Sequence, residues 1–554
     1  MMIRPLANQP IALPTRSAPA AARTPSDRME SAPLPDHVPG EVLVKLKSGS
    51  GLSDFASDYG ASVAERFKLG PTLQESAEQW LRLSLPTGTS VEQALSRMGE
   101  DGRVAWVEPN FTYALAEAPN DLHPDLWGLN NQGQTGGTAG ADISAPGAWA
   151  TVRGSNQADA PVIAVIDTGM DMSHPDLVNN LWTNPGEIPG NGIDDDGNGV
   201  VDDVHGYDAY NQHGNPVDEH FHGTHVSGTI GAEGNNNQGV VGVNWQARLM
   251  PIKIFAGSSP TTNAATILRG VAYATQMGAR ITSNSWGGGA YSQALFDAFA
   301  SSPALHIAGA GNNGTDNDQR PFYPSSYDMP NMVAVAATDH NDQKARFSCY
   351  GAQTVHLAAP GVSILSTVPN NGYAAYNGTS MATPHVSGVA GLIATAYPQA
   401  SNEEIKQRLL LSTDPVEAMQ GRSTTGGRLN AARAVENDQV APAAPNDLRA
   451  VETAPDRVTM QWTATGDDSW CGQAAAYRLR VSDQPIEDLQ AARLIATARP
   501  AATGTLERAS IAVEPAAEAR TLHVALEVLD NVGNASQVRF AQVEVPAAPP
   551  PPEG

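Results

Sequence analysis

Cysteine is scarce in this chain. Only Cys349 and Cys471 occur among 554 residues. Small disulfide-stapled scaffolds need several closely spaced cysteines, so that class is excluded. The two cysteines fall in segments that we assign to different domains, which leaves one bridge between domains open.

Positive charge and long apolar runs are also scarce. The chain has 33 Lys and Arg against 58 Asp and Glu, a formal net charge of -25. A surface of that sign repels phosphate groups, so we expect neither a nucleic acid nor an anionic membrane as partner. No run of about 18 apolar residues occurs, and we therefore expect no membrane span.

The first residues make a poor signal peptide. After Met1 to Arg4, several prolines and Arg16 interrupt any continuous apolar core of about seven residues or more. Either the true start lies upstream, or export uses another route, or the protein stays inside the cell.

The length predicts about three domains. Composition and periodicity divide the chain into six segments. These are a disordered Pro/Ala-rich leader (1–38), a small α+β domain (39–117), a large α/β domain (120–435), a linker (436–446), an all-β sandwich (447–545) and a Pro-rich tail (546–554).

Alternation predicts strands in the small domain at 41–47, 79–85 and 104–107. Helices are predicted at 52–59 and after Ser90, which forms a capping-box signature with Gln93.

The large domain alternates short apolar runs with helical segments. Strands are predicted at 162–166, 306–308 and 332–337, and helices at 264–277 and 401–411. This pattern indicates a mostly parallel sheet with helices on both faces. Alternating runs at 458–462, 477–481 and 522–529 predict the sandwich.

Ser380 lies in the segment N-G-T-S-M-A-T-P-H-V-S-G, residues 377–388. An apolar run from Val386 to Ala396 predicts a buried helix, with Ser380 near its N-terminus. Free N–H groups and the helix dipole favour negative charge there, which suits a serine whose attack on a carbonyl creates an oxyanion. The alternative is that Ser380 only caps the helix.

Two further segments supply an acid and a base. The strand 162–166 ends in Asp167, at the sheet edge where open α/β folds place their sites. His222 opens H-G-T-H-V-S-G. A serine nucleophile needs a base and a buried acid that orients it, and Asp, His, Ser is a known triad order.

Each segment also has another interpretation. The D-T-G segment could belong to an aspartic protease, but no second such loop occurs. His222 and His225 could bind zinc, but H-E-x-x-H is absent, so we interpret His225 as structural. Ser380 could also be the nucleophile of an α/β-hydrolase, but Ala382 stands where the G-x-S-x-G motif of that class needs glycine, which weakens this interpretation.

Together the segments V-I-D-T-G (165–169), H-G-T-H-V-S-G (222–228) and G-T-S-M-A-T-P-H-V-S-G (378–388) resemble the three signatures of subtilisin-like serine proteases. The resemblance covers about 120–435 and implies that family's three-layer α/β fold. It assigns Asp167 as orienting acid, His222 as base and Ser380 as nucleophile, acting on proteins or peptides through an acyl-enzyme.

The resemblance also implies a substrate site. Asn312, in A-G-N, would donate to the oxyanion together with the Ser380 N–H, and S-W-G-G at 285–288 would pair with an extended peptide. The residues expected to bind substrate are Ser285, Trp286, Gly287, Gly309, Ala310 and Gly311. A broad, apolar-leaning preference is the default expectation.

Residues 194–203, D-D-D-G-N-G-V-V-D-D, space oxygen ligands like the first half of an EF-hand loop. A solvated acidic turn is the alternative. Five carboxylates within ten residues repel one another without a cation, which favours calcium. The predicted ligands are Asp194, Asp196, Asn198, Val200, Asp202 and Asp203. The resemblance implies a second calcium site at Asp176 and Asn236.

The flanking domains have resemblances of their own. Residues 39–117 resemble the family's inhibitory prodomain, an intramolecular inhibitor cut away near 113–121. Residues 447–545 resemble a fibronectin type III module, through V-T-M-Q-W-T and L-D-N-V-G-N-A-S.

The sequence thus predicts a secreted, monomeric, calcium-stabilised serine endopeptidase made as a self-processing zymogen. Two alternatives remain. One is a non-catalytic surface binding or adhesion protein in which the sandwich is the working part. The other is a leaderless regulatory protease with one narrow substrate.

Overall fold

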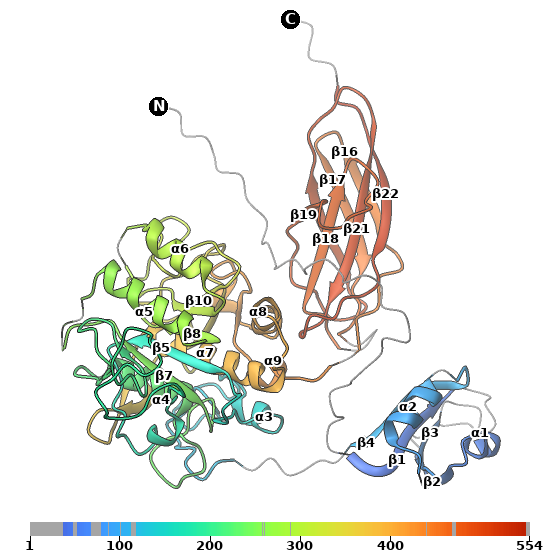
Figure 1. Ribbon diagram of the computed structural model, residues 1–554. Coiled ribbons are helices and arrows are strands. Elements are labelled where there is room, and N and C mark those ends of the chain that lie inside the picture. Colours follow the sequence, from blue (N-terminus) through green and yellow to red (C-terminus); the bar gives the residue numbers. More distant parts are fainter. Residues whose placement is uncertain are drawn as a thin grey trace, which may run out of the picture. The chain divides into compact units, whose positions relative to one another are not determined.

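The computed structural model describes residues 37–47, 52–67, 79–86, 88–99, 101–111, 118–257, 259, 261–288, 290–438, 440–467 and 472–549. These residues belong to two compact units that divide after Leu115 (Figure 1). Most of the predicted leader and tail, part of the predicted processing segment, and Cys471 lie outside the described residues.

In its described residues, the N-terminal unit forms one antiparallel sheet with two helices. Its elements are β1 (His37–Leu46), α1 (Leu52–Asp58), β2 (Ser62–Phe67), β3 (Gln79–Ser84), α2 (Val91–Gly99) and β4 (Val104–Phe111). The sheet order is β2-β3-β1-β4. The sequence missed β2, because this edge strand buries little of its surface and carries no apolar alternation.

The large domain is built on a nine-stranded sheet. Its strands are β5 (Val162–Asp167), β6 (Tyr207–Asp208), β7 (Arg248–Lys253), β8 (Ile281–Asn284), β9 (Leu305–Gly309), β10 (Met332–Thr338), β11 (Leu357–Pro360), β14 (Asp414–Pro415) and β15 (Gly427–Arg428). The order is β14-β15-β11-β10-β9-β8-β5-β7-β6. The pairings are parallel apart from the β14–β15 pair, so the prediction of a mostly parallel sheet is confirmed.

Helices cover both faces of this sheet (Figure 1). They are α3 (Ala145–Trp149), α4 (His222–Gly231), α5 (Ala264–Gln276), α6 (Gln293–Ser301), α7 (Thr379–Ala396), α8 (Asn402–Leu411) and α9 (Ala431–Ala434). Alternate residues of β5 separate the two cores. Ile163 and Val165 pack with α4 and α7, whereas Ala164 and Ile166 pack with α5 and α6. Both faces are buried, which explains why β5 has no polar residue before Asp167.

The prediction that Ser380 lies near the N-terminus of a buried helix is confirmed by α7. The helix starts at Thr379, so Pro384 lies inside it. Pro384 has no N–H to donate to the carbonyl four residues back, which belongs to Ser380. That carbonyl accepts a hydrogen bond from Ser285 Oγ instead, at 3.0 Å. The proline therefore connects the helix start to the loop that follows β8.

The C-terminal region is a sandwich of two antiparallel sheets. One sheet has the order β16 (Arg449–Ala454), β17 (Arg457–Thr463), β20 (Leu506–Ala512). The other has the order β19 (Arg493–Ile495), β18 (Ala476–Ser482), β21 (Arg520–Leu529), β22 (Arg539–Val545). Trp462 and Tyr477 pack edge to face across its core, with ring centroids 5.0 Å apart. Within the part of the chain that the structure covers, no helix has the length and apolar character that a membrane crossing requires.

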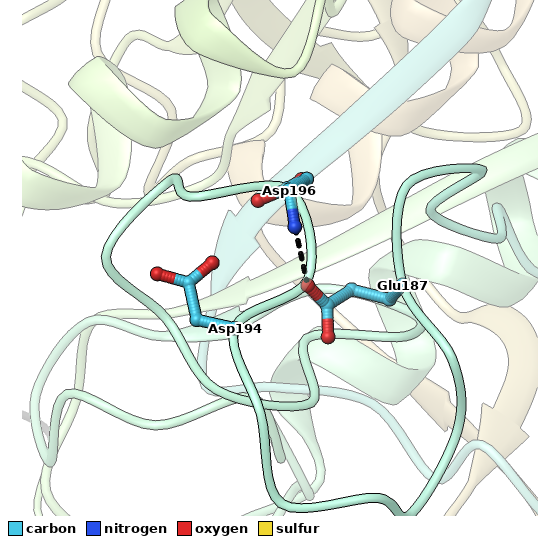
Figure 2. A group of neighbouring side chains, drawn as sticks. All are labelled: Glu187, Asp194 and Asp196. Carbon is cyan, nitrogen blue, oxygen red and sulfur yellow. Dashed lines mark hydrogen bonds between the residues drawn. The ribbon is translucent and has the colours of Figure 1, made fainter.

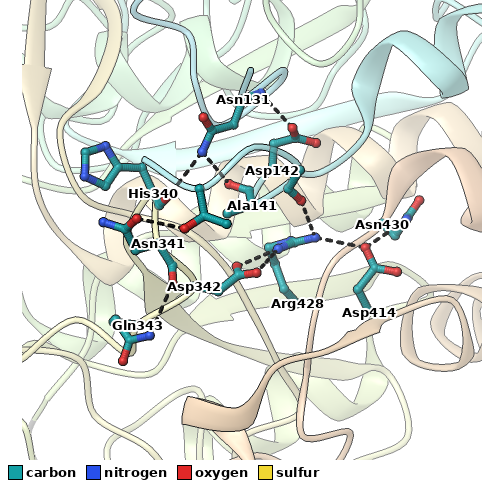
Figure 3. Close-up of polar contacts among 12 residues, drawn as sticks. Asn131, Ala141, Asp142, His340, Asn341, Asp342, Gln343, Asp414, Arg428 and Asn430 are labelled. Carbon is teal, nitrogen blue, oxygen red and sulfur yellow. Dashed lines mark hydrogen bonds and ion pairs between the residues drawn. The ribbon is translucent and has the colours of Figure 1, made fainter. Parts of the chain in front are cut away.

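A buried arginine joins three distant segments of the large domain (Figure 3). The Arg428 side chain, on β15, is 4% exposed and forms ion pairs with Asp342 at 2.5 Å and Asp414 at 2.9 Å. It also donates to the carbonyl of Gly140 at 3.0 Å. Residues near both ends of the domain are thereby held on the loop that follows β10.

We predict that Arg428→Met destabilises the protein by about 2–3 kcal/mol, because two carboxylates lose their shared cation. The carboxylates are each 30% exposed, so water replaces part of the lost interaction. Urea unfolding measures the effect, with the exposed Arg346→Met as control. Equal unfolding free energies for the two variants would contradict a stabilising role for the network.

Candidate active site

Asp167 lies at the C-terminal end of β5, and its side chain is 1% exposed. Its Oδ1 accepts hydrogen bonds from the Thr168 N–H and from Nδ1 of His222, each at 2.7 Å. An ionised carboxylate can only accept, so Nδ1 must carry the proton. The hydrogen bond therefore fixes the tautomer and leaves Nε2 of a neutral His222 as the acceptor.

The backbone around His222 is tightly packed. His222 is the first residue of α4, and a Cβ on Gly223 would lie 2.1 Å from the carbonyl oxygen of Gly169. Only glycine permits this contact between α4 and the loop after β5. Phe221, just before the histidine, has φ 152°, a conformation that costs a non-glycine residue about 1–3 kcal/mol. Backbone packing thus holds the imidazole against Asp167.

The charges around His222 favour its protonated form. Burial alone would lower the pKa of His222, but attraction and hydrogen bonding by Asp167, with a further contribution from Asp218, outweigh burial and raise the pKa above its usual value. Asp218 is 6% exposed and accepts hydrogen bonds from Thr168 Oγ1 and the Thr224 N–H. An imidazolium formed here is stabilised by two carboxylates.

Ser380 is the second residue of α7, at the helix end where N–H groups lack intrahelical partners. Its Oγ donates to the carbonyl of Ser285 at 2.9 Å. Among the described residues no hydrogen bond joins Ser380 to His222. Catalytic hydrogen bonds are often absent or long until substrate binds, so this geometry does not argue against a reactive serine.

The side-chain amide of Asn312 has a fixed orientation. Its Oδ1 accepts from the Thr379 N–H at 2.9 Å and from Thr379 Oγ1 at 3.1 Å. Thr379 Oγ1 also accepts from the Gly311 N–H at 3.2 Å, which joins the two segments again. With Oδ1 occupied, the Nδ2 donor is directed away from Thr379 and is available to another acceptor.

A cleft of 670 Å³ contains these side chains. His222, Asn312 and Ser380 line it together with Gly309, Gly311 and the segment Ser285–Gly288. The Trp286 indole donates to the carbonyl of Ile166 at 2.8 Å, so its ring forms a fixed part of the wall. The predicted substrate residues line the cleft apart from Ala310, which is fully buried.

His225 has a different environment from His222. Its Nε2 contacts the carbonyl oxygens of Ile364 and Ala374 at 3.0 and 3.1 Å. Burial lowers the pKa of His225 to about 4, so the ring is neutral. It fixes α4 to the hairpin of β12 (Ile364–Val368) and β13 (Gly372–Tyr376), as expected of a structural histidine.

Three carboxylates lie close together in the acidic loop, residues 187–203 (Figure 2). Glu187, Asp194 and Asp196 each offer an oxygen within 4.8 Å of the others. Glu187 is 8% exposed, and its Oε2 is buried without a hydrogen-bond partner among the described residues. A cation would satisfy this oxygen, so the donor set fits a hard metal ion such as calcium.

The other predicted ligands of this loop, Asn198, Val200, Asp202 and Asp203, take part in hydrogen bonds with neighbouring protein groups. Asp202 accepts hydrogen bonds from the N–H groups of Gly190 and Gly192, and Asp203 accepts from the Tyr273 hydroxyl and two amides. Asn198 Oδ1 accepts from the Val200 N–H at 2.8 Å. These contacts hold the loop together, and Asn198 lies beside the three-carboxylate group, because its N–H donates to Asp194 Oδ1 and Asp196 Oδ1.

Asp176 and Asn236, the predicted second site, are in contact. Asn236 Nδ2 donates to Asp176 Oδ1 at 2.9 Å, and Tyr373 donates its hydroxyl to Oδ2 at 2.8 Å. Asp121 accepts from the Asn236 N–H through Oδ2, and its buried Oδ1 has no partner among the described residues. The two oxygens of Asp176 thus accept hydrogen bonds from protein donors, and Oδ1 of Asp121 is the carboxylate oxygen of this set left for a cation.

Several residues of these sites were missed at the sequence level. Glu187 and Asp121 lie outside the patterns that suggested metal binding, and Asp218 lies before the histidine motif. Thr379 was available in G-T-S, but only the hydrogen bonds to Asn312 give it a role.

Comparisons with known proteins agree with this geometry. The family model described as Subtilase family matches residues 158–439, and the model described as Fervidolysin N-terminal prodomain matches residues 23–110.

The chain is 36% identical to thermitase of Thermoactinomyces vulgaris over 297 residues, 53% of this chain and 94% of thermitase. It is 33% identical to the thermophilic serine proteinase of Bacillus sp. (strain AK1), across 62% of this chain and 76% of that protein. Identity to subtilisin DY of Bacillus licheniformis is 38%, across 45% of this chain and 81% of that protein.

The site geometry, the matched family model and these relatives lead to one conclusion. The chain belongs to the subtilase family and is a serine endopeptidase with an N-terminal prodomain.

Proposed function

We propose that Ser380 is the nucleophile, His222 the general base and Asp167 the acid that orients it. The observation that carries this proposal is the 2.7 Å hydrogen bond between His222 Nδ1 and Asp167 Oδ1, in a cleft that Ser380 and Asn312 also line. Substrate binding would move the Ser380 hydroxyl from the carbonyl of Ser285 to Nε2 of His222.

The reaction then proceeds in two stages. Ser380 Oγ attacks the peptide carbonyl, and its proton passes to Nε2 of His222. The raised pKa of His222 favours this transfer. The imidazolium then gives that proton to the leaving amine, and an acyl-enzyme remains. Water, deprotonated by His222, hydrolyses the ester and restores Ser380.

The oxyanion formed in each stage needs donors already in place. We assign Asn312 Nδ2 and the Ser380 N–H to this task. The hydrogen bonds from Thr379 to Asn312 Oδ1 support the assignment, because they orient Nδ2 before substrate arrives. The segment Ser285–Gly288 would pair with the extended substrate.

The triad proposal predicts that Ser380→Ala abolishes self-processing in the segment 113–121 and labelling by a fluorophosphonate probe. The substitution removes the one oxygen that forms the covalent bond. Gel electrophoresis with fluorescence measures both, and Ser387→Ala, on the buried side of α7, is the control that keeps the nucleophile. Labelling of Ser380→Ala equal to that of wild type would exclude Ser380 as the nucleophile.

The electrostatics of His222 predict a pKa above about 6.5, the usual histidine value. In the inactive Ser380→Ala background, NMR titration of the ring would show this value. Adding Asp167→Asn should lower the pKa, because the imidazolium loses the carboxylate that stabilises it. In active enzyme, kcat/KM should therefore rise with pH through a midpoint above about 6.5. A His222 pKa unaffected by Asp167→Asn would contradict the account.

We further propose that the prodomain inhibits the large domain until it is removed, so that the protein is a zymogen. The match to a prodomain model supports this role.

The proposed domain limits are 39–117 for the prodomain, 120–435 for the protease and 447–545 for the sandwich. The antiparallel sheets of three and four strands support a fibronectin type III-like module. Secretion and a monomeric state complete the proposal.

Calcium is the proposed structural cofactor. Glu187, Asp194 and Asp196 would hold one ion, and Asp121, Asp176 and Asn236 would help to hold another. The orphaned oxygens of Glu187 and Asp121 support these assignments. The metal would cross-link loops and take no part in the chemistry.

Chelation should therefore lower the Tm of the Ser380→Ala protein. In the same Ser380→Ala background, adding Glu187→Gln should make this fall in Tm smaller, since one site is already weakened. Adding the exposed Asp159→Asn should leave the full fall. Differential scanning calorimetry with and without a calcium chelator measures this. An unchanged Tm on chelation would contradict the calcium assignment, and an equal fall in all variants would contradict the site at Glu187.

A further inference from the structure

We propose that Phe322 limits the substrate residue immediately before the cleaved bond to a small side chain, such as Gly, Ala or Ser. This inference rests on the proposed function, because it assumes that Ser380 attacks the carbonyl of that residue. It replaces the broad, apolar-leaning substrate preference expected from the sequence with a definite substrate class.

The position of that substrate residue follows from the site. Its carbonyl carbon must reach Ser380 Oγ while its oxygen faces Asn312. Its backbone then runs along Ser285–Gly287, and its side chain points between this segment and Gly309–Gly311. Both segments line the cleft, the first through Ser285, Trp286 and Gly287 and the second through Gly309 and Gly311.

The ring of Phe322 lies between these two segments and contacts both. A Cβ on Gly287 would lie 2.4 Å from Cε1 of Phe322, and a Cβ on Gly311 would lie 3.1 Å from both Cγ and Cδ2. The ring thus packs against the bare Cα atoms of two glycines on opposite sides. Phe322 also lines the cleft, so its ring is the surface that an entering side chain would meet.

The backbone of Phe322 is firmly held. Its N–H donates to Ser326 Oγ at 3.0 Å, and its carbonyl accepts from Ser325 Oγ at 2.7 Å. The next residue, Tyr323, accepts from the Gly288 N–H at 2.9 Å. A shift of the whole turn would break these bonds and the pairing with the substrate-binding segment. Only the ring itself could move.

A large substrate side chain would therefore have to displace the ring from its contacts with Gly287 and Gly311. A methyl or hydroxymethyl group needs no displacement. Pocket contacts of this size change kcat/KM by about 10–200-fold per methylene-sized difference. Cleavage after Ala should accordingly exceed cleavage after Phe or Leu.

The test uses the self-processed enzyme and chromogenic tetrapeptides that differ only in the last residue, which is Ala, Leu or Phe. The variants are Phe322→Ala, Phe322→Leu and Phe540→Ala, a control that removes an exposed phenylalanine from β22. Fluorophosphonate titration gives the concentration of active enzyme, and melting curves check the fold.

We expect wild type and Phe540→Ala to prefer Ala. The ratio of kcat/KM for Phe over Ala should rise by about 10-fold or more in Phe322→Ala and by less in Phe322→Leu. If active wild-type enzyme already prefers Phe or Leu, or if Phe322→Ala leaves the ratio unchanged, the inference is overturned and the protease assignment stands. If wild type neither labels nor cleaves any peptide, the proposed function fails as well.

Discussion

The site depends on one hydrogen bond, from His222 Nδ1 to a carboxylate that the end of a parallel strand holds out of water. Burying a charge is costly unless it is paired, so the Asp167 carboxylate requires the hydrogen bond from His222. This requirement restricts the relative orientation of the two side chains. The glycine contact at Gly223 and the strained Phe221 show how the backbone achieves this. The fold thus holds the base in one tautomer and one orientation, and the strained backbone at Phe221 is part of the energetic cost.

Hydrogen bonds also fix the start of α7 relative to the rest of the site. Pro384 leaves the Ser380 carbonyl without its helical partner, and Ser285 donates to it. Ser285 in turn accepts the Ser380 hydroxyl, while Thr379 orients Asn312. Nucleophile, oxyanion donor and substrate-binding segment are therefore joined by a few short bonds. A substitution at Ser285 or Thr379 would disturb all three, although neither residue is part of the triad.

The sequence predicted the fold class and the three motifs because each rests on local patterns: an all-apolar strand ending in Asp167, glycines around His222, and a small-residue helix after Ser380. It failed where a feature depends on contacts between distant segments. Strand β2 was missed because it carries no apolar alternation. Glu187 joins Asp194 and Asp196 only through loop folding, and Phe322 meets Gly287 only across the cleft.

The central claim is that Ser380, His222, Asp167 and Asn312 act as one acyl-transfer site. The most direct measurement is a crystal structure of the processed enzyme with a peptide aldehyde or boronic acid. The account predicts a covalent bond from Ser380 Oγ, with the tetrahedral oxygen about 3 Å from Asn312 Nδ2 and from the Ser380 N–H. An adduct on another residue, or an oxygen directed to solvent away from Asn312, would contradict it.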